Sequence, residues 1–155
     1  MMQDSQSALW LGTIDDVYRF DGEHFYSLRP YGFPRERVTN LTEDSSGGVW
    51  ITTQTPNPQS DLASGGIYRY QNGKVKKIIS EAAVSAVNAG PGTMLSTIVH
   101  RTGWDYGDLY IFRESGSGWQ SERLLERDAR YLSVDHKGTV LFPCRAGRCE
   151  LSAGL

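Results

Sequence analysis

A short strand followed by a tight turn recurs along this chain, and no other sequence feature constrains the fold as strongly. The segments Gly66–Gly73 and Gly147–Gly154 align without a gap, and shorter copies begin at Asp16 and Gly107. In three of the copies an Asp-Gly, Asn-Gly or Ala-Gly pair supplies the turn. Self-similarity of this kind indicates a repeat architecture.

A second element precedes each copy: a polar turn that leads into an apolar strand. Asp44–Thr52 is the most complete example, and Asp135–Phe142 keeps its spacing. Gly90–Thr97 is a degenerate copy without the aspartate, and Leu9–Thr13 is the second half of a copy truncated by the start of the chain. The two aspartates lie 91 residues apart across two units. The period is therefore about 45 residues, which is typical of a β-propeller blade.

Each complete unit contains four predicted strands. In the second unit they span residues 37–43, 49–53, 66–70 and 74–79. No window of useful length shows a sustained apolar stripe of helical period. Residues 121–130 are rich in helix formers, but they fall where the fourth strand and the next connection are expected, so we expect them to be non-helical. We expect fourteen strands, with the first unit lacking its inner strand and the last unit its outer one.

These observations predict an all-β fold. The 155 residues correspond to about three and a half four-stranded antiparallel blades of a partial β-propeller, in one domain. The predicted blade units cover about residues 8–36, 37–80, 81–128 and 129–155. Because both ends of the chain already read as strand, we expect a piece excised from a longer protein.

The most regular residues of the repeat have structural roles. The aspartates accept hydrogen bonds from the backbone of their own turns, the glycines take positive φ, and the tryptophans pack between blades. The residues expected in these roles are Trp10, Asp44, Gly47, Trp50, Asp135 and Gly138.

The repeat resembles that of the two-component regulator propeller family. The resemblance rests on Asp44-x-x-Gly47-x-Val49-Trp50 followed by Gly66-Ile67-Tyr68-Arg69-Tyr70, with a further copy around Trp10–Gly22. It is specific in the first two units and degenerate in the last two. It implies a seven-bladed propeller in the extracytoplasmic, periplasmic sensor region of bacterial hybrid histidine kinases and related signalling proteins. Such a parent protein carries its kinase domain elsewhere, and polysaccharide fragments are the implied ligands.

Composition excludes some partners. Lys and Arg number 16 against 18 Asp and Glu, so the net charge of −2 offers no basic excess for a nucleic acid. No apolar run approaches the roughly 20 residues of a membrane span, and we expect no membrane contact by this segment. No signal peptide is visible at the start.

An incomplete ring has two open blade faces rich in aromatic and aliphatic side chains. Apolar faces of this kind are usually covered in soluble proteins. We therefore expect self-association through these faces, with a propeller completed by a second chain as one outcome.

The longest loops lie on one side of the predicted blades, and rigidly supported loops commonly carry binding residues. In the first candidate loop, Trp104 and Tyr106 can stack on sugar rings and three neighbours can hydrogen-bond. A second candidate covers residues 29–35. The predicted ligand residues are Tyr31, Arg35, His100, Arg101, Trp104, Asp105 and Tyr106.

No catalytic constellation stands out. The three histidines are far apart, and none has metal-ligand spacing to a cysteine or to another histidine. We expect no cofactor, no metal and no enzymatic activity. Cys144 and Cys149 flank a predicted turn and either pair as a disulfide or remain free thiols.

The main hypothesis is a non-catalytic sensor or ligand-binding propeller segment of a two-component signalling protein. Two alternatives remain open. One is a protein–protein interaction scaffold without a small ligand, and the other is a glycoside-active propeller enzyme related to lyases or sialidases.

Overall fold

The computed structural model describes residues 1–102 and 106–152, which form four antiparallel sheets. Blade one contains β1 (Met2–Gln3), β2 (Leu9–Gly12), β3 (Val17–Phe20) and β4 (Phe25–Ser27). Blade two contains β5 (Val38–Glu43), β6 (Val49–Thr53), β7 (Ile67–Gln71) and β8 (Lys74–Ile79). Blade three contains β9 (Ala83–Gly90), β10 (Thr93–Ile98), β11 (Gly107–Ser115) and β12 (Gly118–Ala129). Blade four contains β13 (Ser133–Val134), β14 (Val140–Cys144) and β15 (Gly147–Leu151).

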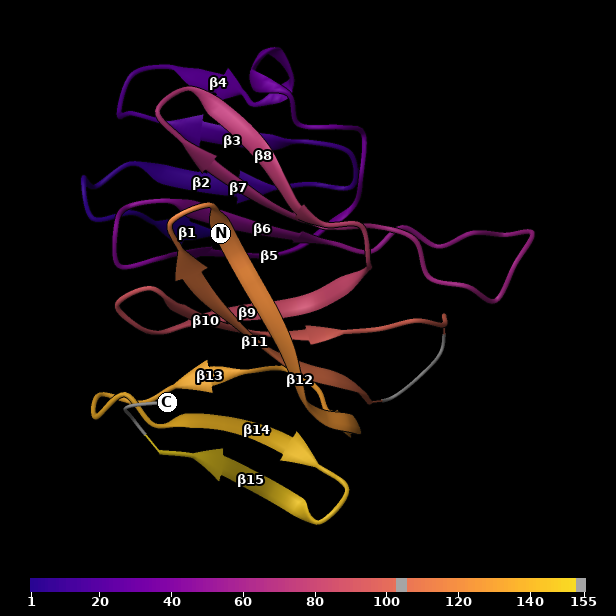
Figure 1. Cartoon of the computed structure of the whole chain (residues 1–155). Coiled ribbons are helices and arrows are strands. Elements are labelled where there is room, and N and C mark those ends of the chain that lie inside the picture. The colour runs from indigo at the N-terminus through magenta and orange to yellow at the C-terminus, as the bar shows by residue number, and fades with distance from the viewer. Residues whose placement is uncertain (103–105, 153–155) are drawn as a thin grey trace.

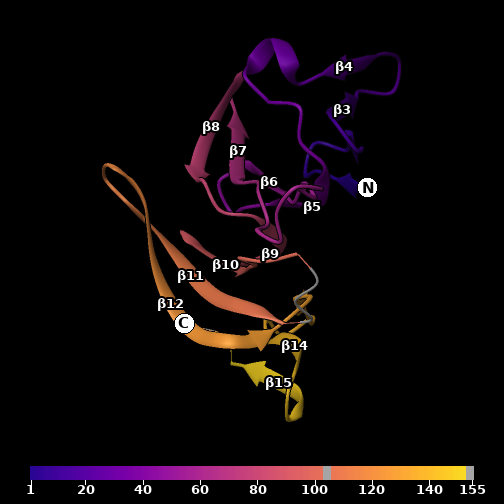
Figure 2. The ribbon, with the colours of Figure 1, turned by 90° about the vertical axis from the view of Figure 1, so that its right-hand side faces the viewer.

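Each sheet is a meander in which every strand pairs with the next strand along the chain. The four sheets stack in chain order (Figure 1) and fan out around their first strands (Figure 2). The sheets do not close into a ring. The predicted all-β fold, a partial propeller, is therefore confirmed. A short 3-10 helix, η1 (Arg29–Tyr31), lies in the connection between blades one and two.

The hydrophobic core lies between the blades. One cluster joins blades one and two around Trp10 and Ile51, and a second joins blades two and three around Trp50 and Phe112. A third joins blades three and four and includes Phe142. Side chains alternate between the two faces of a strand, so each middle blade supplies apolar residues to both of its neighbours. The tryptophans of the repeat pack between blades, as predicted.

The start of blade one differs from the prediction. We expected the first unit to lack its inner strand, but Met2 pairs with Trp10 and Gln3 pairs with Leu9 across β1 and β2. The described residues therefore contain fifteen strands rather than fourteen. Residues 121–130 are non-helical, as predicted, since β12 continues to Ala129 in spite of its helix-forming composition. Pairing with the neighbouring strand β11 outweighs the helix propensity of those residues, because propensity is only a weak preference.

Blade four has three strands, and a disulfide joins Cys144 of β14 to Cys149 of β15. The bond closes a hairpin and fixes its end covalently. Across the part of the chain that the structure describes, no helix is long and apolar enough to cross a membrane.

Candidate functional site

Two long loops project from one side of the molecule, on the right in Figure 1, and the second of them contains the start of the first candidate ligand loop, at His100. One loop follows β6 in blade two, and the other follows β10 in blade three. Arg101 Nη1 lies 2.7 Å from Asp61 Oδ2, and the Ala63 amide donates to the His100 carbonyl at 3.0 Å. The loops of two neighbouring blades therefore support each other.

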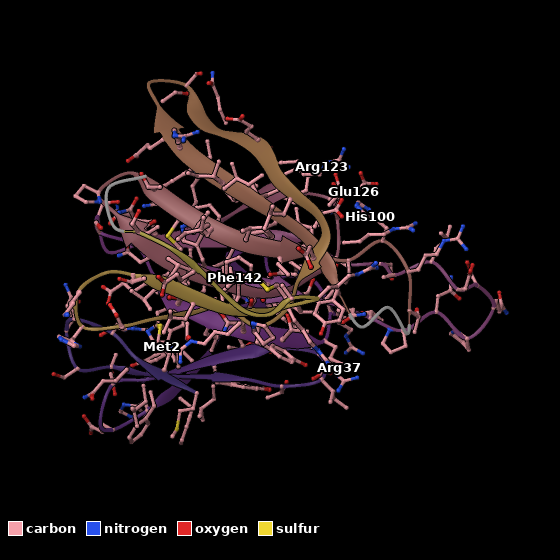
Figure 3. All side chains as sticks on the ribbon, turned by 90° about the horizontal axis from the view of Figure 1, so that it is seen from below. Met2, Arg37, His100, Arg123, Glu126 and Phe142 are labelled. Atoms are coloured by element: carbon pink, nitrogen blue, oxygen red, sulfur yellow. A yellow bond between two sulfur atoms is a disulfide. The ribbon has the colours of Figure 1, made fainter. Side chains whose placement is uncertain are left out.

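His100 forms a charged cluster within blade three. Its Nε2 lies 3.1 Å from Asp108 Oδ2, and its Nδ1 lies 3.6 Å from Glu81 Oε2. The Asp108 side chain is only 3% exposed, and its Oδ1 accepts a hydrogen bond of 2.8 Å from the Arg127 amide. Arg123 Nη1 approaches the same carboxylate at 3.5 Å, and Figure 3 shows His100 and Arg123 on the same side of the molecule. The cluster joins β11, β12 and the connection before β9.

The second predicted loop lies at a different interface. Tyr31 belongs to η1 and packs edge-on against Tyr70, with ring centroids 5.9 Å apart. Arg35 is exposed further along the same connection. Tyr31 therefore packs against blade two.

The remaining predicted ligand residues belong to the loop before β11. Tyr106 is half-buried, and two residues lie outside the described part of the chain: Trp104 and Asp105. Since His100 and Arg101 already have carboxylate partners, the role of these loops in ligand binding stays a prediction.

In blade two the repeat residues form a buried hydrogen-bond network around Asp44. Its Oδ2 accepts bonds from Trp50 Nε1 at 2.9 Å and from Arg69 Nε at 2.6 Å. Its Oδ1 accepts bonds from the amides of Ser46 at 3.0 Å and Gly48 at 2.9 Å. The Asp44 side chain is 3% exposed. One carboxylate therefore ties the β5–β6 turn to the indole on β6 and to the guanidinium on β7.

These contacts determine the charge state of Asp44. Burial by itself would raise the pKa of this carboxyl, but hydrogen bonds from Arg69, Trp50 and Gly48 and the charge of Arg69 bring the pKa below its ordinary value. The carboxylate is ionised at neutral pH and holds Arg69 in place. A side chain at Gly48 would collide with the Arg69 guanidinium, so a larger residue there would displace Arg69 from Asp44.

A groove of about 670 Å³ opens beside this network, between the outer parts of blades two and three. Its existence follows from the lengths of two connections. Ten residues join β4 to β5, and two of them, Leu28 and Phe33, pack between blades one and two. Only residues 80–82 join β8 to β9. So short a connection cannot fill the corresponding space between blades two and three.

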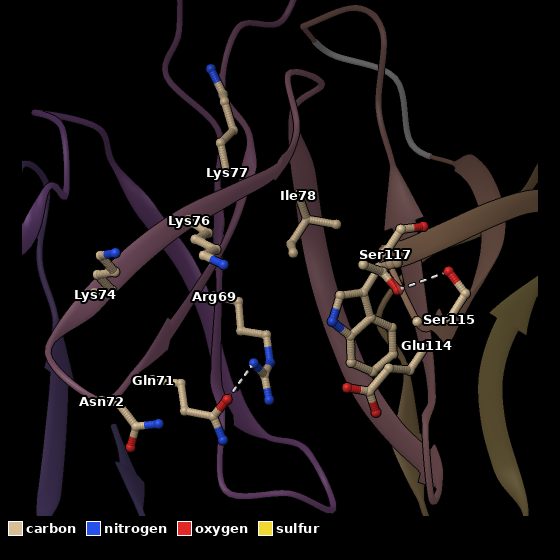
Figure 4. A pocket seen from close by; sticks show the side chains of 13 residues that line it. Arg69, Gln71, Asn72, Lys74, Lys76, Lys77, Ile78, Glu114, Ser115 and Ser117 are labelled. Atoms are coloured by element: carbon tan, nitrogen blue, oxygen red, sulfur yellow. Dashed lines mark hydrogen bonds between the residues drawn. The ribbon is translucent and has the colours of Figure 1, made fainter.

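The floor of the groove is built from both blades. The Arg69 guanidinium lies 5.8 Å from the centre of the Trp119 ring, and the Trp119 ring meets Trp50 edge-on at 4.8 Å. Ile78 borders the same space, as Figure 4 shows. Because Asp44 fixes Arg69 and Trp50, the floor is a rigid extension of the propeller repeat.

The two walls differ in chemistry. The β7–β8 hairpin supplies three lysines, and the β11–β12 hairpin supplies a carboxylate and two hydroxyls. The charged and hydroxyl side chains of the walls are Lys74, Lys76, Lys77, Glu114, Ser115 and Ser117. Lys77 extends over the Tyr68 ring at 5.5 Å, on the side of blade one.

The structure thus shows repeated blades with an aspartate turn that anchors a buried tryptophan. Residues 32–55 match the family model described as Two component regulator propeller. The matched segment includes β5, the Asp44 turn and β6, so the resemblance inferred from the repeat is confirmed. No curated protein matches the chain.

The propeller repeat also extends to a residue that the sequence analysis missed. Asp4 stands six residues before Trp10, the same spacing as in blade two, and its Oδ2 accepts a hydrogen bond of 2.8 Å from Trp10 Nε1. The first copy therefore includes Asp4, and our expectation that the copy was truncated before Leu9 was wrong. It was hidden because Ser7 occupies the position of Gly47.

Ser7 adopts a φ of 68°, which is unfavourable for a residue with a side chain. We expect Ser7→Gly to raise the free energy of unfolding by about 1 kcal/mol, because glycine takes this conformation without strain. Urea denaturation monitored by tryptophan fluorescence measures the change. The reverse substitution, Gly47→Ser, should lower stability by a similar amount, and a destabilised Ser7→Gly variant would contradict the argument.

The groove lysines were also missed as site residues, because the sequence analysis assigned them only to a strand. A run with lysine at 74, 76 and 77 contains three of the four lysines of the chain. That concentration was visible in the sequence, but the facing hairpin was not.

Proposed function

We propose that this chain is a non-catalytic, ligand-binding segment of a bacterial sensor protein, and that the groove between blades two and three is its ligand site. The observation that carries the proposal is the groove itself. It is preformed, its floor is held by buried hydrogen bonds, and its volume lies within the usual range of about 300–1,000 Å³ for small-molecule sites.

The family match supports the sensor context, since such propellers are implied to lie in the extracytoplasmic part of signalling proteins. The disulfide between Cys144 and Cys149 agrees with that location, because disulfides persist mainly in oxidising compartments. No group of three or more potential metal ligands occurs among the described residues. The proposal assigns binding rather than catalysis to the propeller and places the kinase in another part of the parent protein.

Titration of the ¹⁵N-labelled chain with a set of neutral and acidic oligosaccharides tests this proposal. The indole N–H signal of Trp119, on the groove floor, should shift on binding. The signal of Trp10, buried between blades one and two, should stay unchanged as an internal control. If no oligosaccharide moves the Trp119 signal, the ligand-site proposal is wrong. If shortened products accumulate during the titration, the glycoside-active enzyme is the better interpretation.

A second candidate function is assembly through an open blade face. Leu9, Leu11, Tyr18 and Phe20 share the face of blade one that points away from blade two, and Phe25 stacks on Phe20 with ring centroids 4.5 Å apart. Phe25 is 61% exposed. We propose that this face mediates self-association, as an interaction scaffold would require.

The repeat itself indicates what such a face accommodates. The register pairs Trp10 with Arg19 in blade one and Trp50 with Arg69 in blade two. By this equivalence, the residues on the open face of blade one correspond to the residues of blade two that pack against blade one. The matching residues of blade two are Val49, Ile51, Tyr68 and Tyr70. Light scattering on a sizing column measures the solution mass, and a monomer at high concentration would contradict self-association.

A further inference from the structure

We infer that the groove between β8 and the β11–β12 hairpin binds an acidic saccharide, that is, a hydroxylated ligand with carboxylate or sulfate groups. The inference rests on the proposed function, because it names the ligand class of the same site. It is carried by the distribution of charge and hydroxyl groups on the two walls of the groove.

The first wall is cationic in a chain whose net charge is −2. Three of the four lysines in the sequence border the groove. Lys74 and Lys76 are two residues apart on β8, so they lie on the same face of the strand, together with Ile78, which packs toward blade three. Both lysines are exposed, and no carboxylate of the described residues lies within 4 Å of either. Their charges are therefore available to an anionic ligand.

The arginines near this interface differ from the two lysines, because each arginine is paired with a carboxylate. Arg69 lines the same groove, but its Nε lies 2.6 Å from Asp44 Oδ2, so its charge is neutralised within the protein. Arg113, on β11, lies 3.4 Å from Glu122. Both arginines therefore have carboxylate partners, whereas Lys74 and Lys76 do not.

The second wall selects for hydroxyl groups. Glu114 lies on the same face of β11 as Phe112, toward blade two, and Ser115 and Ser117 flank it at the hairpin end. A carboxylate accepts hydrogen bonds from sugar hydroxyls but repels an acidic group. A ligand in this groove therefore places its acidic group on the lysine wall and its hydroxyls on the Glu114 wall.

The floor favours a ring-shaped ligand over a flexible chain. The Trp119 indole and the Arg69 guanidinium line the groove between the walls, with the guanidinium 5.8 Å from the ring centre and held by Asp44. A surface that is already ordered loses little conformational entropy on binding. Sugar rings present apolar C–H faces that pack on such surfaces, whereas an acidic peptide offers charge without ring hydroxyls.

Calorimetric titration with four probes tests the inference: tetragalacturonate, a chondroitin sulfate tetrasaccharide, neutral maltotetraose and a tetraglutamate peptide. We expect one or both acidic saccharides to bind at least about tenfold more tightly than maltotetraose and the peptide, with affinity falling as salt is added. Tetragalacturonate carries carboxylates alone, whereas the chondroitin sulfate tetrasaccharide carries both carboxylates and sulfates. Comparing their affinities shows which acidic group the site recognises.

The variant Lys74→Gln/Lys76→Gln should weaken binding of the acidic saccharide by about tenfold or more, since each lysine donates a charge-assisted hydrogen bond. Lys137→Gln is the matched control, because Lys137 is the fourth lysine and lies in the β13–β14 turn of blade four. It makes the same Lys→Gln exchange away from the groove, removing one positive charge against two in the double variant, and should leave binding unchanged. All three lysines are exposed, so the variants should fold normally, which circular dichroism verifies.

The outcomes separate this inference from the proposed function. If maltotetraose binds as tightly as tetragalacturonate and shifts the Trp119 signal, the ligand site is supported but the acidic class is wrong. If tetraglutamate binds best, the site recognises charge alone and the saccharide class is wrong. If Lys137→Gln weakens binding as much as the double variant, the groove is not the site, and both proposals fail.

Discussion

Asp44→Ala should lower the free energy of unfolding by about 3–5 kcal/mol, the range expected when one member of a buried ion pair is removed. The substitution leaves the Arg69 guanidinium, whose side chain is 13% exposed, without its carboxylate. It also removes the acceptor for Trp50 Nε1, a donor at the interface between blades two and three. Urea denaturation followed by circular dichroism measures the loss.

Asp135→Ala is the matched control, because Asp135 occupies the same place in the fourth copy of the repeat. Among the described residues, the side chain of Asp135 accepts hydrogen bonds only from two amides of its own turn. These are the amides of Lys137 at 2.8 Å and Thr139 at 2.9 Å, both bonded to Oδ1. We expect a loss of about 1 kcal/mol there. Equal losses in the two variants would show that Asp44 acts through its turn alone.

The effect of Asp44→Ala should also depend on pH. The pKa of Asp44 is lower in the folded chain than its ordinary value, so its stabilising contribution is fully present above the unfolded pKa, near 3.9. That contribution is lost as the pH falls through the folded pKa. The difference in stability between wild type and variant should therefore shrink in acid and remain constant near neutrality.

If the open face of blade one mediates the self-association proposed above, Phe25→Lys should shift the chain from a dimer, of twice 17.3 kDa, to a monomer of 17.3 kDa. Phe25 is 61% exposed and stacks on Phe20 at the open face of blade one, so a charge at this position would be buried in any interface that covers the face. We expect the dimer dissociation constant to rise at least about thirtyfold, as for a strong interface residue. Sedimentation equilibrium at several concentrations measures it.

Tyr26→Lys provides the control for this change. Tyr26 is the next residue of β4, is 41% exposed, and lies opposite Arg19 on the other face of blade one. It should leave the dissociation constant unchanged while adding the same charge. If both variants dissociate equally, net charge rather than the open face governs assembly.

The sequence predicted those features that depend on contacts between neighbouring segments. A β-meander pairs each strand with the next, and its turns carry glycine and aspartate at fixed offsets, so the repeat was readable without any knowledge of long-range packing. The copy in blade one was only half recognised, because Ser7 replaces the glycine that marks the turn. Asp4 kept the spacing to Trp10, and that spacing was the available signal.

The candidate site was less predictable. The loop residues His100 and Arg101 were expected to be available to a ligand, yet both have carboxylate partners. Asp61, the partner of Arg101, is distant in the sequence, and no sequence motif identifies Asp108 as the partner of His100. The concentration of lysines on β8 was visible in the sequence, but it did not predict a groove, because the facing hairpin lies more than thirty residues further along the chain.

The sequence by itself determined the strand pattern, the blade period and the structural roles of Asp44 and Trp50, since these follow from local turn chemistry and side-chain alternation. Only the tertiary structure decided which residues face one another across two blades. The angle between blades two and three, and the short connection over residues 80–82, place the lysines of β8 opposite Glu114 and leave a groove over Trp119. Such an arrangement depends on the packing of whole sheets, which no local pattern in the chain encodes.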